Sequence, residues 1–99
     1  MPTKQAAAQP KRIPVGSRVR WFARYPSDPI HEGVVQAFVP RGSRWPASTH
    51  CMGKNLGGDA YLALRDRTPS GQPKATPDIM RPYASRLEAQ NPELLQVTQ

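Results

Sequence analysis

Proline and glycine interrupt this chain along most of its length, and this limits the folds open to it. Twelve prolines and seven glycines occur among 99 residues. Proline ends or kinks a helix because it lacks the backbone N–H and has a fixed φ, and both residues favour turns. We therefore exclude long helices and predict short strands joined by turns. The length allows a single domain with a small core.

The expected order of elements is four strands, a helical turn and a closing strand. The expected strands cover residues 17–24, 32–39, 59–65 and 75–80, and residues 81–88 form the helical turn that leads into the last strand. Gly33 suits a β-bulge or a close crossing of two chains. Pro77 confines the fourth strand to a sheet edge, because proline cannot donate a hydrogen bond to a neighbour.

Apolar side chains at alternate strand positions define the expected core. In the third expected strand Ala60, Leu62 and Leu64 share one face, and we expect this face to point inward. The residues predicted to dominate the interior are Val19, Trp21, Val34, Val35, Phe38, Tyr61, Leu62, Leu64, Ile79 and Leu87.

The two ends of the chain are more polar than its middle. We predict a disordered basic arm at residues 1–14 and a folded all-β domain at 15–89. Within this domain, residues 41–58 form a long irregular loop, which is typical of a functional segment. Residues 90–99 form a flexible tail or a short helix, for which Asn91-Pro92-Glu93 is a typical start.

The order of these elements resembles the Src-homology-3-like small barrel. The resemblance is carried by Gly16-Ser17-Arg18-Val19-Arg20, Glu32-Gly33-Val34-Val35 and Pro82-Tyr83-Ala84-Ser85-Arg86-Leu87-Glu88. It implies a strongly bent, five-stranded β-barrel. The class includes KOW domains, Tudor-type modules, the stromal accessory subunit of photosystem I and the type II dihydrofolate reductases, so the architecture does not fix a function.

Positive charge is concentrated in the first 58 residues. The chain has 14 lysines and arginines against seven acids, and the whole net charge of +7 comes from residues 1–58. Ten of the 14 cations are arginines, which suit planar, bidentate contacts to phosphate or carboxylate. A polyanion such as nucleic acid is therefore the natural partner, although basic composition alone also occurs in proteins without such a partner.

Two segments are candidate binding sites. In the first expected strand Arg18, Arg20, Phe22 and Arg24 share one face, where cations attract phosphate and the ring stacks on a base. In the long loop the candidates are Arg41, Arg44, Trp45 and Lys54. The alternatives are a merely solvated strand face and a tryptophan that caps one end of the barrel.

Several chemistries are excluded by what the sequence lacks. Cys51 is the single cysteine, so no internal disulfide forms and a reducing cytoplasm is the default compartment. Cys51, His31 and His50 are too few for a structural zinc site, and no acid or oxyanion group is evident that would make Cys51 a nucleophile. Type II reductases use a late Val-Gln-Ile-Tyr segment, and residues 76–80 depart from it. No apolar run reaches membrane-spanning length.

The sequence thus predicts a non-enzymatic, cytoplasmic binding module without metal or cofactor, encoded by a phage or another mobile element. Nucleic acid, either DNA or RNA, is the leading partner. The alternative is an adaptor, small inhibitor or assembly factor that docks an acidic protein.

Overall fold

The computed structural model describes residues 11–49 and 52–97. Most of the expected basic arm, together with His50 and Cys51, lies outside the described residues. The elements in chain order are β1 (Lys11–Arg12), β2 (Arg18–Phe22), β3 (Ile30–Val39), η1 (Ala47–Thr49), β4 (Ala60–Arg67), β5 (Pro73–Met80), α1 (Ala84–Gln90), η2 (Pro92–Leu94) and β6 (Gln96–Val97).

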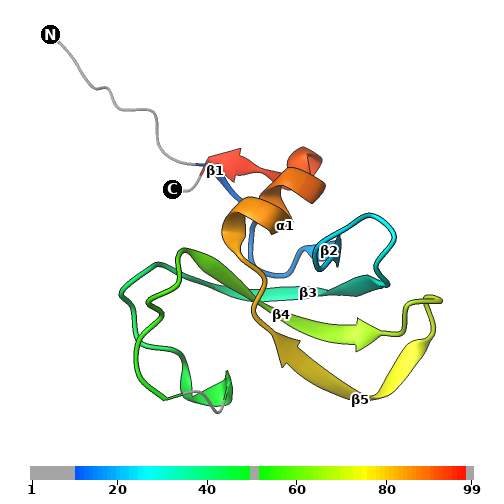
Figure 1. Cartoon of the computed structure of the whole chain (residues 1–99), viewed down its shortest axis with the longest axis horizontal. Helices are drawn as coiled ribbons and strands as arrows, with labels where there is room; N and C mark the ends of the chain where they lie inside the picture. The colour runs from blue at the N-terminus through cyan, green and yellow to red at the C-terminus, as the bar shows by residue number, and fades with distance from the viewer. Residues whose placement is uncertain (1–10, 50–51, 98–99) are drawn as a thin grey trace, which may run out of the picture.

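The strands form two antiparallel sheets (Figure 1). Four of them make one sheet in the order β2-β3-β4-β5, and β1 pairs with β6 in a second, two-stranded sheet. The prediction of a mainly β protein with little helix is confirmed. The predicted closure into a five-stranded barrel is not confirmed, because β2 and β5 are the edges of the larger sheet and do not pair with each other.

Gly33 lies at the first of two irregularities that bend β3. The register with β4 shifts between Glu32 and Gly33 and again between Val35 and Ala37. A Cβ atom at Gly33 would collide with the backbone carbonyl of Leu64, so only glycine fits where β3 and β4 approach most closely. The expectation of a bulge or close crossing at Gly33 is confirmed.

The core lies between the larger sheet and α1. Its buried cluster comprises Ile13, Val19, Trp21, Val35, Tyr61, Ala63, Ala84 and Leu87. Leu62 is also buried, whereas four predicted core residues are only half-buried: Val34, Phe38, Leu64 and Ile79. The prediction that Ala60, Leu62 and Leu64 form the inward face of β4 was incomplete. Tyr61 and Ala63, on the opposite face, belong to the main buried cluster. α1 packs on the face that carries Tyr61 and Ala63, since Ala84 and Leu87 belong to the same cluster.

The free edge of β2 is covered by side chains rather than by a strand. Asn91 accepts a hydrogen bond from the Arg20 amide at 3.3 Å and donates to the Arg20 carbonyl at 2.9 Å. Gln90 makes the same pair of contacts to Phe22, at 2.8 and 3.4 Å. Two consecutive side-chain amides at the end of α1 thus satisfy the backbone groups that a neighbouring strand would otherwise pair, and protect the edge from another chain.

The folded unit begins before residue 15, which corrects the predicted boundary. Lys11 and Arg12 pair with Val97 and Gln96, and Ile13 is 3% exposed within the core. The backbone N–H of Ile13 donates to the Tyr61 hydroxyl at 3.0 Å. Residues 11–14 belong to the domain because Ile13 supplies apolar surface that a core of this size needs, although two charged residues precede it in the sequence.

Candidate functional site

The outward side chains of β2 are partly neutralised by the protein's own acids. Arg18 forms a bidentate contact with Asp66, with both N–O distances 3.0 Å, and a second contact with Glu32 at 3.2 Å. The hydrogen bond with Asp66 raises the pKa of Arg18 and lowers that of Asp66. Arg20 is more exposed and lies 3.9 Å from Glu32. The structure therefore leaves Arg18 little free charge for an external anion.

Arg24 does not continue the face of Arg18 and Arg20. β2 ends at Phe22, and the following turn is held by Asp28, which accepts hydrogen bonds from the amides of Arg24 and Tyr25, each at 2.9 Å. The two-residue alternation predicted through residue 24 therefore stops early. Arg24 instead borders a hollow together with Trp21, whose side chain points to the other face of β2.

Phe22 is half-buried and lines a different, shallow hollow with Arg20, Ile30 and Gln90. Its backbone is held by Gln90, as described above. The structure therefore separates Phe22 and Arg20 from Arg24. The four residues predicted to share one face are divided between two surfaces.

The long loop is more ordered than the sequence predicted. Asn55 is 2% exposed, and its side-chain amide donates to the carbonyls of Val39, at 3.0 Å, and Gly58, at 2.6 Å. Its side-chain oxygen accepts from the Gly57 amide at 3.2 Å. This part of the predicted irregular loop is thus held by one buried asparagine, whose hydrogen-bonding capacity is nearly used up.

Two short segments of the loop, which carry candidate binding residues, pair with each other through backbone hydrogen bonds. The backbones of Arg44 and Lys54 pair as an isolated bridge, and the Trp45 amide donates to the Gly53 carbonyl at 3.0 Å. Arg41, Arg44 and Lys54 are exposed and form no ion pair with a described carboxylate. Arg44, Trp45 and Lys54 therefore stay together on one fixed segment, and Arg41 precedes it, with its backbone amide donating to Asp59 at 2.8 Å.

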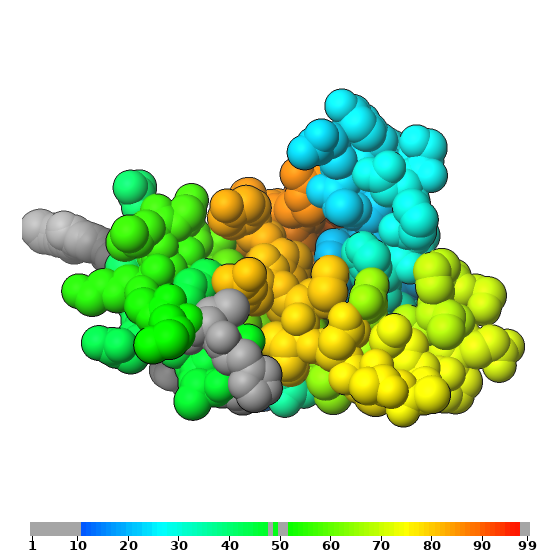
Figure 2. Space-filling view, turned by 60° about the horizontal axis from the view of Figure 1, so that its bottom comes forward, coloured from blue at the N-terminus to red at the C-terminus, as the bar shows by residue number. Residues whose placement is uncertain are grey.

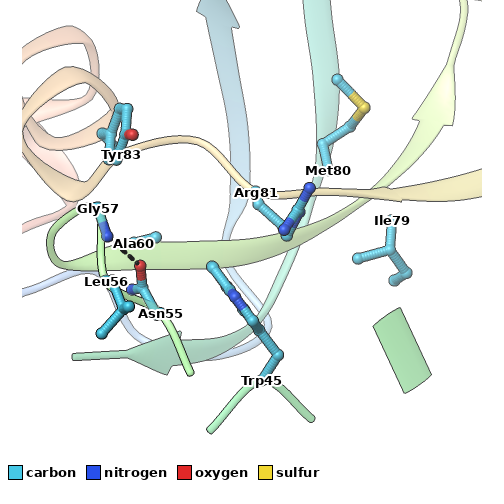
Figure 3. Close-up of a pocket in the computed structure, with 9 residues that line it drawn as sticks. All are labelled: Trp45, Asn55, Leu56, Gly57, Ala60, Ile79, Met80, Arg81 and Tyr83. Carbon is cyan, nitrogen blue, oxygen red and sulfur yellow. Dashed lines mark hydrogen bonds between the residues drawn. The ribbon is translucent and has the colours of Figure 1, made fainter. Parts of the chain in front are cut away.

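A hollow of about 440 Å³ lies between this loop and the segment after β5 (Figure 3). We call it the Trp45 hollow; its walls include Trp45, Leu56, Arg81 and Tyr83. The guanidinium carbon of Arg81 lies 4.9 Å from the centre of the Trp45 ring, a cation–π contact. Tyr83, which is 52% exposed, stands on the opposite side of the hollow. An aromatic pair and a guanidinium group thus surround one cavity.

A second hollow of about 320 Å³ shares a wall with the first. We call it the Arg86 hollow; Arg24, Arg81 and Arg86 line it together with Trp21 and His31. Met80, Arg81 and Tyr83 line both hollows, so the residues that leave β5 separate the two. Figure 2 shows the loop (green), the segment after β5 (yellow to orange) and the turn after β2 (cyan) on one face of the molecule.

The charges around these two hollows are of one sign. No acidic residue lines either of them, and Arg24, Arg81 and Arg86 form no ion pair with any acid in the described ranges. A further hollow on the other side of Tyr83 contains Asp59 and Glu88 and therefore does not favour an anion. Among the described residues, the paired hollows thus combine arginines that lack an acidic partner with adjacent aromatic rings.

His31 adds to the wall of the Arg86 hollow from within the sheet, and Arg65 lies behind it. Burial lowers the pKa of His31, and the nearby charge of Arg65 lowers it further. The Arg65 guanidinium lies 3.2 Å from the His31 ring nitrogen Nδ1 and binds Asp78 at 2.7 and 3.0 Å. His31 is therefore neutral near pH 7, and Arg65 is balanced by its own partner.

Arg81, Tyr83 and Arg86 are site residues that sequence reasoning missed. They were assigned to the helical turn before the last strand, and the charge count directed attention to the first 58 residues. The signal was present in Arg81-Pro82-Tyr83-Ala84-Ser85-Arg86, where two arginines flank a tyrosine without an intervening acid. Asn55 gave no comparable signal, because only the folded loop shows that it is buried.

Within residues 11–49 and 52–97, no three His, Cys, Asp or Glu side chains come together in a way that could hold a metal ion. In the same ranges no helix is long and apolar enough to cross a membrane. The comparison of the chain with protein-family models, curated proteins and solved structures gives no significant match.

Proposed function

We propose that this protein is a non-enzymatic module that binds nucleic acid at the paired hollows. The observation that carries the proposal is the set of three arginines, Arg24, Arg81 and Arg86, around an acid-free hollow beside Trp45 and Tyr83. Arginine donates bidentate hydrogen bonds to phosphate, and aromatic rings stack on bases. Enzymatic activity is not part of the proposal, because the paired hollows combine cations with aromatic groups rather than an acid–base or nucleophile pair.

The loop cations extend this surface beyond the hollows. Arg44 and Lys54 adjoin Trp45 and Asn55 in the chain, and both side chains are exposed. Neither side chain lines the Trp45 hollow, so they would contact phosphates only outside it. Such contacts are not specific for sequence, so we propose that they supply attraction and orientation.

The alternative partner, an acidic protein, would pair with the same arginines but would make fewer contacts with the rings of Trp45 and Tyr83. Carboxylates on a protein surface pair with arginine, whereas a nucleic-acid base can also stack on the rings of Trp45 and Tyr83, which line the adjoining hollow. We therefore rank nucleic acid first. A cytoplasmic location follows from this proposal as the compartment in which such a ligand is met.

Kinship with Src-homology-3-like barrels is proposed as well. Four consecutive antiparallel strands followed by a short helix and a short last strand support it. The pairing of β6 with β1 rather than with the larger sheet departs from a closed barrel, so the proposed kinship rests on the order of the elements alone.

The test is a titration by fluorescence anisotropy with labelled single- and double-stranded oligonucleotides at low and rising salt. We expect binding whose logarithm of affinity falls linearly with the logarithm of salt concentration, with a slope of about 0.7 to 0.9 per phosphate contact. The absence of binding to both kinds of strand at low salt would rule the proposal out.

A charge-matched pair of variants locates the site. Arg81→Gln with Arg86→Gln removes two charges at the hollows, and Arg67→Gln with Lys74→Gln removes two at the distant end of the β4–β5 hairpin (Figure 1). We expect the first pair to weaken binding by about tenfold or more, because a hydrogen bond to a charged group contributes about 1.5–3 kcal/mol. Equal losses in both pairs would mean that net charge alone causes the attraction.

A further inference from the structure

The paired hollows have the chemistry of the two parts of a nucleotide, and this restricts the form of the ligand. The Trp45 hollow offers π-surfaces, and the Arg86 hollow offers three arginines. Arg81 belongs to both, since it lies over the Trp45 ring and also lines the Arg86 hollow. The two cavities therefore adjoin in the way that a base adjoins its own phosphate.

We propose that the site takes an unpaired nucleotide of a single strand, with its base in the Trp45 hollow and its phosphate in the Arg86 hollow. This inference rests on the proposed function. In a duplex both faces of each base are stacked and its edge is paired, so a base enters a side-chain cavity only when it has left the stack. An exposed strand supplies such bases without the cost of unstacking.

The size and walls of the Trp45 hollow support a base rather than a phosphate there. Its volume of about 440 Å³ lies in the range of small-molecule sites, about 300–1,000 Å³. Tyr83 lies on one side of the hollow and the Trp45–Arg81 pair on the other (Figure 3), so aromatic and guanidinium surfaces both line it. Bases in single-stranded sites stack on aromatic rings and on guanidinium planes alike.

The polar groups at this hollow indicate weak sequence preference. Asn55 is the polar uncharged side chain best placed to recognise a base edge, but both of its amide hydrogens are used by Val39 and Gly58. Stacking accepts any base because every base has a π-face. We therefore expect selection for single strands over duplexes, with little selection among sequences.

The closing experiment compares three probes of equal length: oligothymidylate, a base-free strand with the same phosphates, and a duplex. Because the first two probes carry equal charge, their difference isolates the base. Stacking of about 1–3 kcal/mol per base corresponds to about 5- to 150-fold tighter binding of oligothymidylate. We expect this preference in the wild-type protein, and weaker binding of the duplex.

Two variants then assign the preference to the hollow. Trp45→Leu and Tyr83→Leu are both expected to bring the affinity for oligothymidylate toward that for the base-free strand. Far-ultraviolet circular dichroism checks that each variant is folded. Tyr83 is half-exposed, so its substitution keeps the test valid even if Trp45→Leu fails to fold.

The outcomes separate this inference from the proposed function. Equal affinity for oligothymidylate and the base-free strand, or tighter binding of the duplex, would overturn the single-strand inference and leave nucleic-acid binding intact. A preference that persists in both folded variants would overturn the assignment of the base to the Trp45 hollow. No binding to any probe would remove both proposals.

Discussion

Two arginine-rich surfaces meet near the end of β2, and they differ in how their charges are balanced. Arg18 and Arg20 face Glu32 and Asp66, with N–O distances from 3.0 to 3.9 Å. Arg24, only four residues beyond Arg20, borders a hollow that no acid lines. Similar residues in one short segment thus serve two purposes: the first pair joins neighbouring strands, and the third remains available to a ligand. Counting charges in a sequence cannot make this distinction.

The largest expected effect comes from reversing one charge at each surface. Arg24→Glu puts a carboxylate into the Arg86 hollow, where like charges repel a phosphate, and we expect affinity for nucleic acid to fall about tenfold to a hundredfold. Arg20→Glu makes the same change in net charge on the outer face of β2 and is expected to cost about threefold or less. Anisotropy titrations at one salt concentration compare the two.

The contrast between the surfaces would be lost if Arg20→Glu weakened binding as much as Arg24→Glu. Circular dichroism of both variants confirms that neither effect arises from unfolding. That result would show that the outer face of β2 belongs to the binding surface, as the sequence predicted.

The second effect concerns stability and marks β2 as a structural element. Asn91 is 6% exposed and bonds the backbone of Arg20 and the Leu87 carbonyl. Asn91→Ala leaves these groups without partners, and we expect the free energy of unfolding to fall by about 1–3 kcal/mol. Urea denaturation measures the loss. Affinity at the paired hollows, corrected for the folded fraction, should be unchanged.

Gln90→Ala is the matched control for this prediction, because Gln90 makes the equivalent contacts to Phe22 in a less buried position. We expect Gln90→Ala to lower the free energy of unfolding by less than Asn91→Ala does. A larger loss from Gln90→Ala would show that the edge of β2 depends mainly on its outer end.

The alternation and turn residues of the sequence sufficed for the strands of the larger sheet. The strand predicted at residues 32–39 lies within β3, which begins two residues earlier. The strand predicted at residues 59–65 begins one residue before β4, which ends two residues later. Ends that depend on distant contacts were not predictable. Ile13 joins the core through a hydrogen bond to Tyr61, and Asn91 serves β2 from 71 residues away. Such pairings leave no local pattern in the sequence.

The candidate site was predictable in its chemistry and only partly in its residues. Arg24 and Trp45 were identified because charge and aromatic content are local properties, whereas the place of Arg81 and Arg86 depends on how the chain turns after β5. The predicted role of Arg18 was weakened by Asp66, 48 residues away. Which cations remain unpaired is decided by tertiary contacts.

A smaller effect tests the balance of charge on the outer face of β2 directly. Arg18→Gln, Asp66→Asn and the double variant form a thermodynamic cycle. Since both groups are partly exposed, we expect a coupling of about 0.2–1 kcal/mol in the free energy of unfolding at low salt. High salt should reduce it. A coupling near zero would mean that Arg18 is free to serve a ligand after all.

The smallest effect is a pH dependence in which stability and anion binding change in opposite directions. Burial and Arg65 lower the pKa of His31 below its ordinary 6.5, so the folded state binds this proton less readily than the unfolded state. The contribution of His31 to stability is therefore full above about pH 6.5 and is lost as the pH falls toward the lowered pKa. Asp66 and Asp78, whose pKa values are lowered by Arg18 and Arg65, respectively, lose their contributions only below their ordinary 3.8.

Protonated His31 would, however, add a positive charge to the wall of the Arg86 hollow, so acidification from pH 7.5 to 5.5 should weaken folding and strengthen binding of an anion. Urea denaturation and anisotropy at the two pH values measure both trends, with His31→Gln as the control in which both should shrink. The outer face of β2 carries no histidine. A pH response of binding that persists unchanged in His31→Gln would therefore not come from His31, and it would contradict the assignment of the phosphate to the Arg86 hollow.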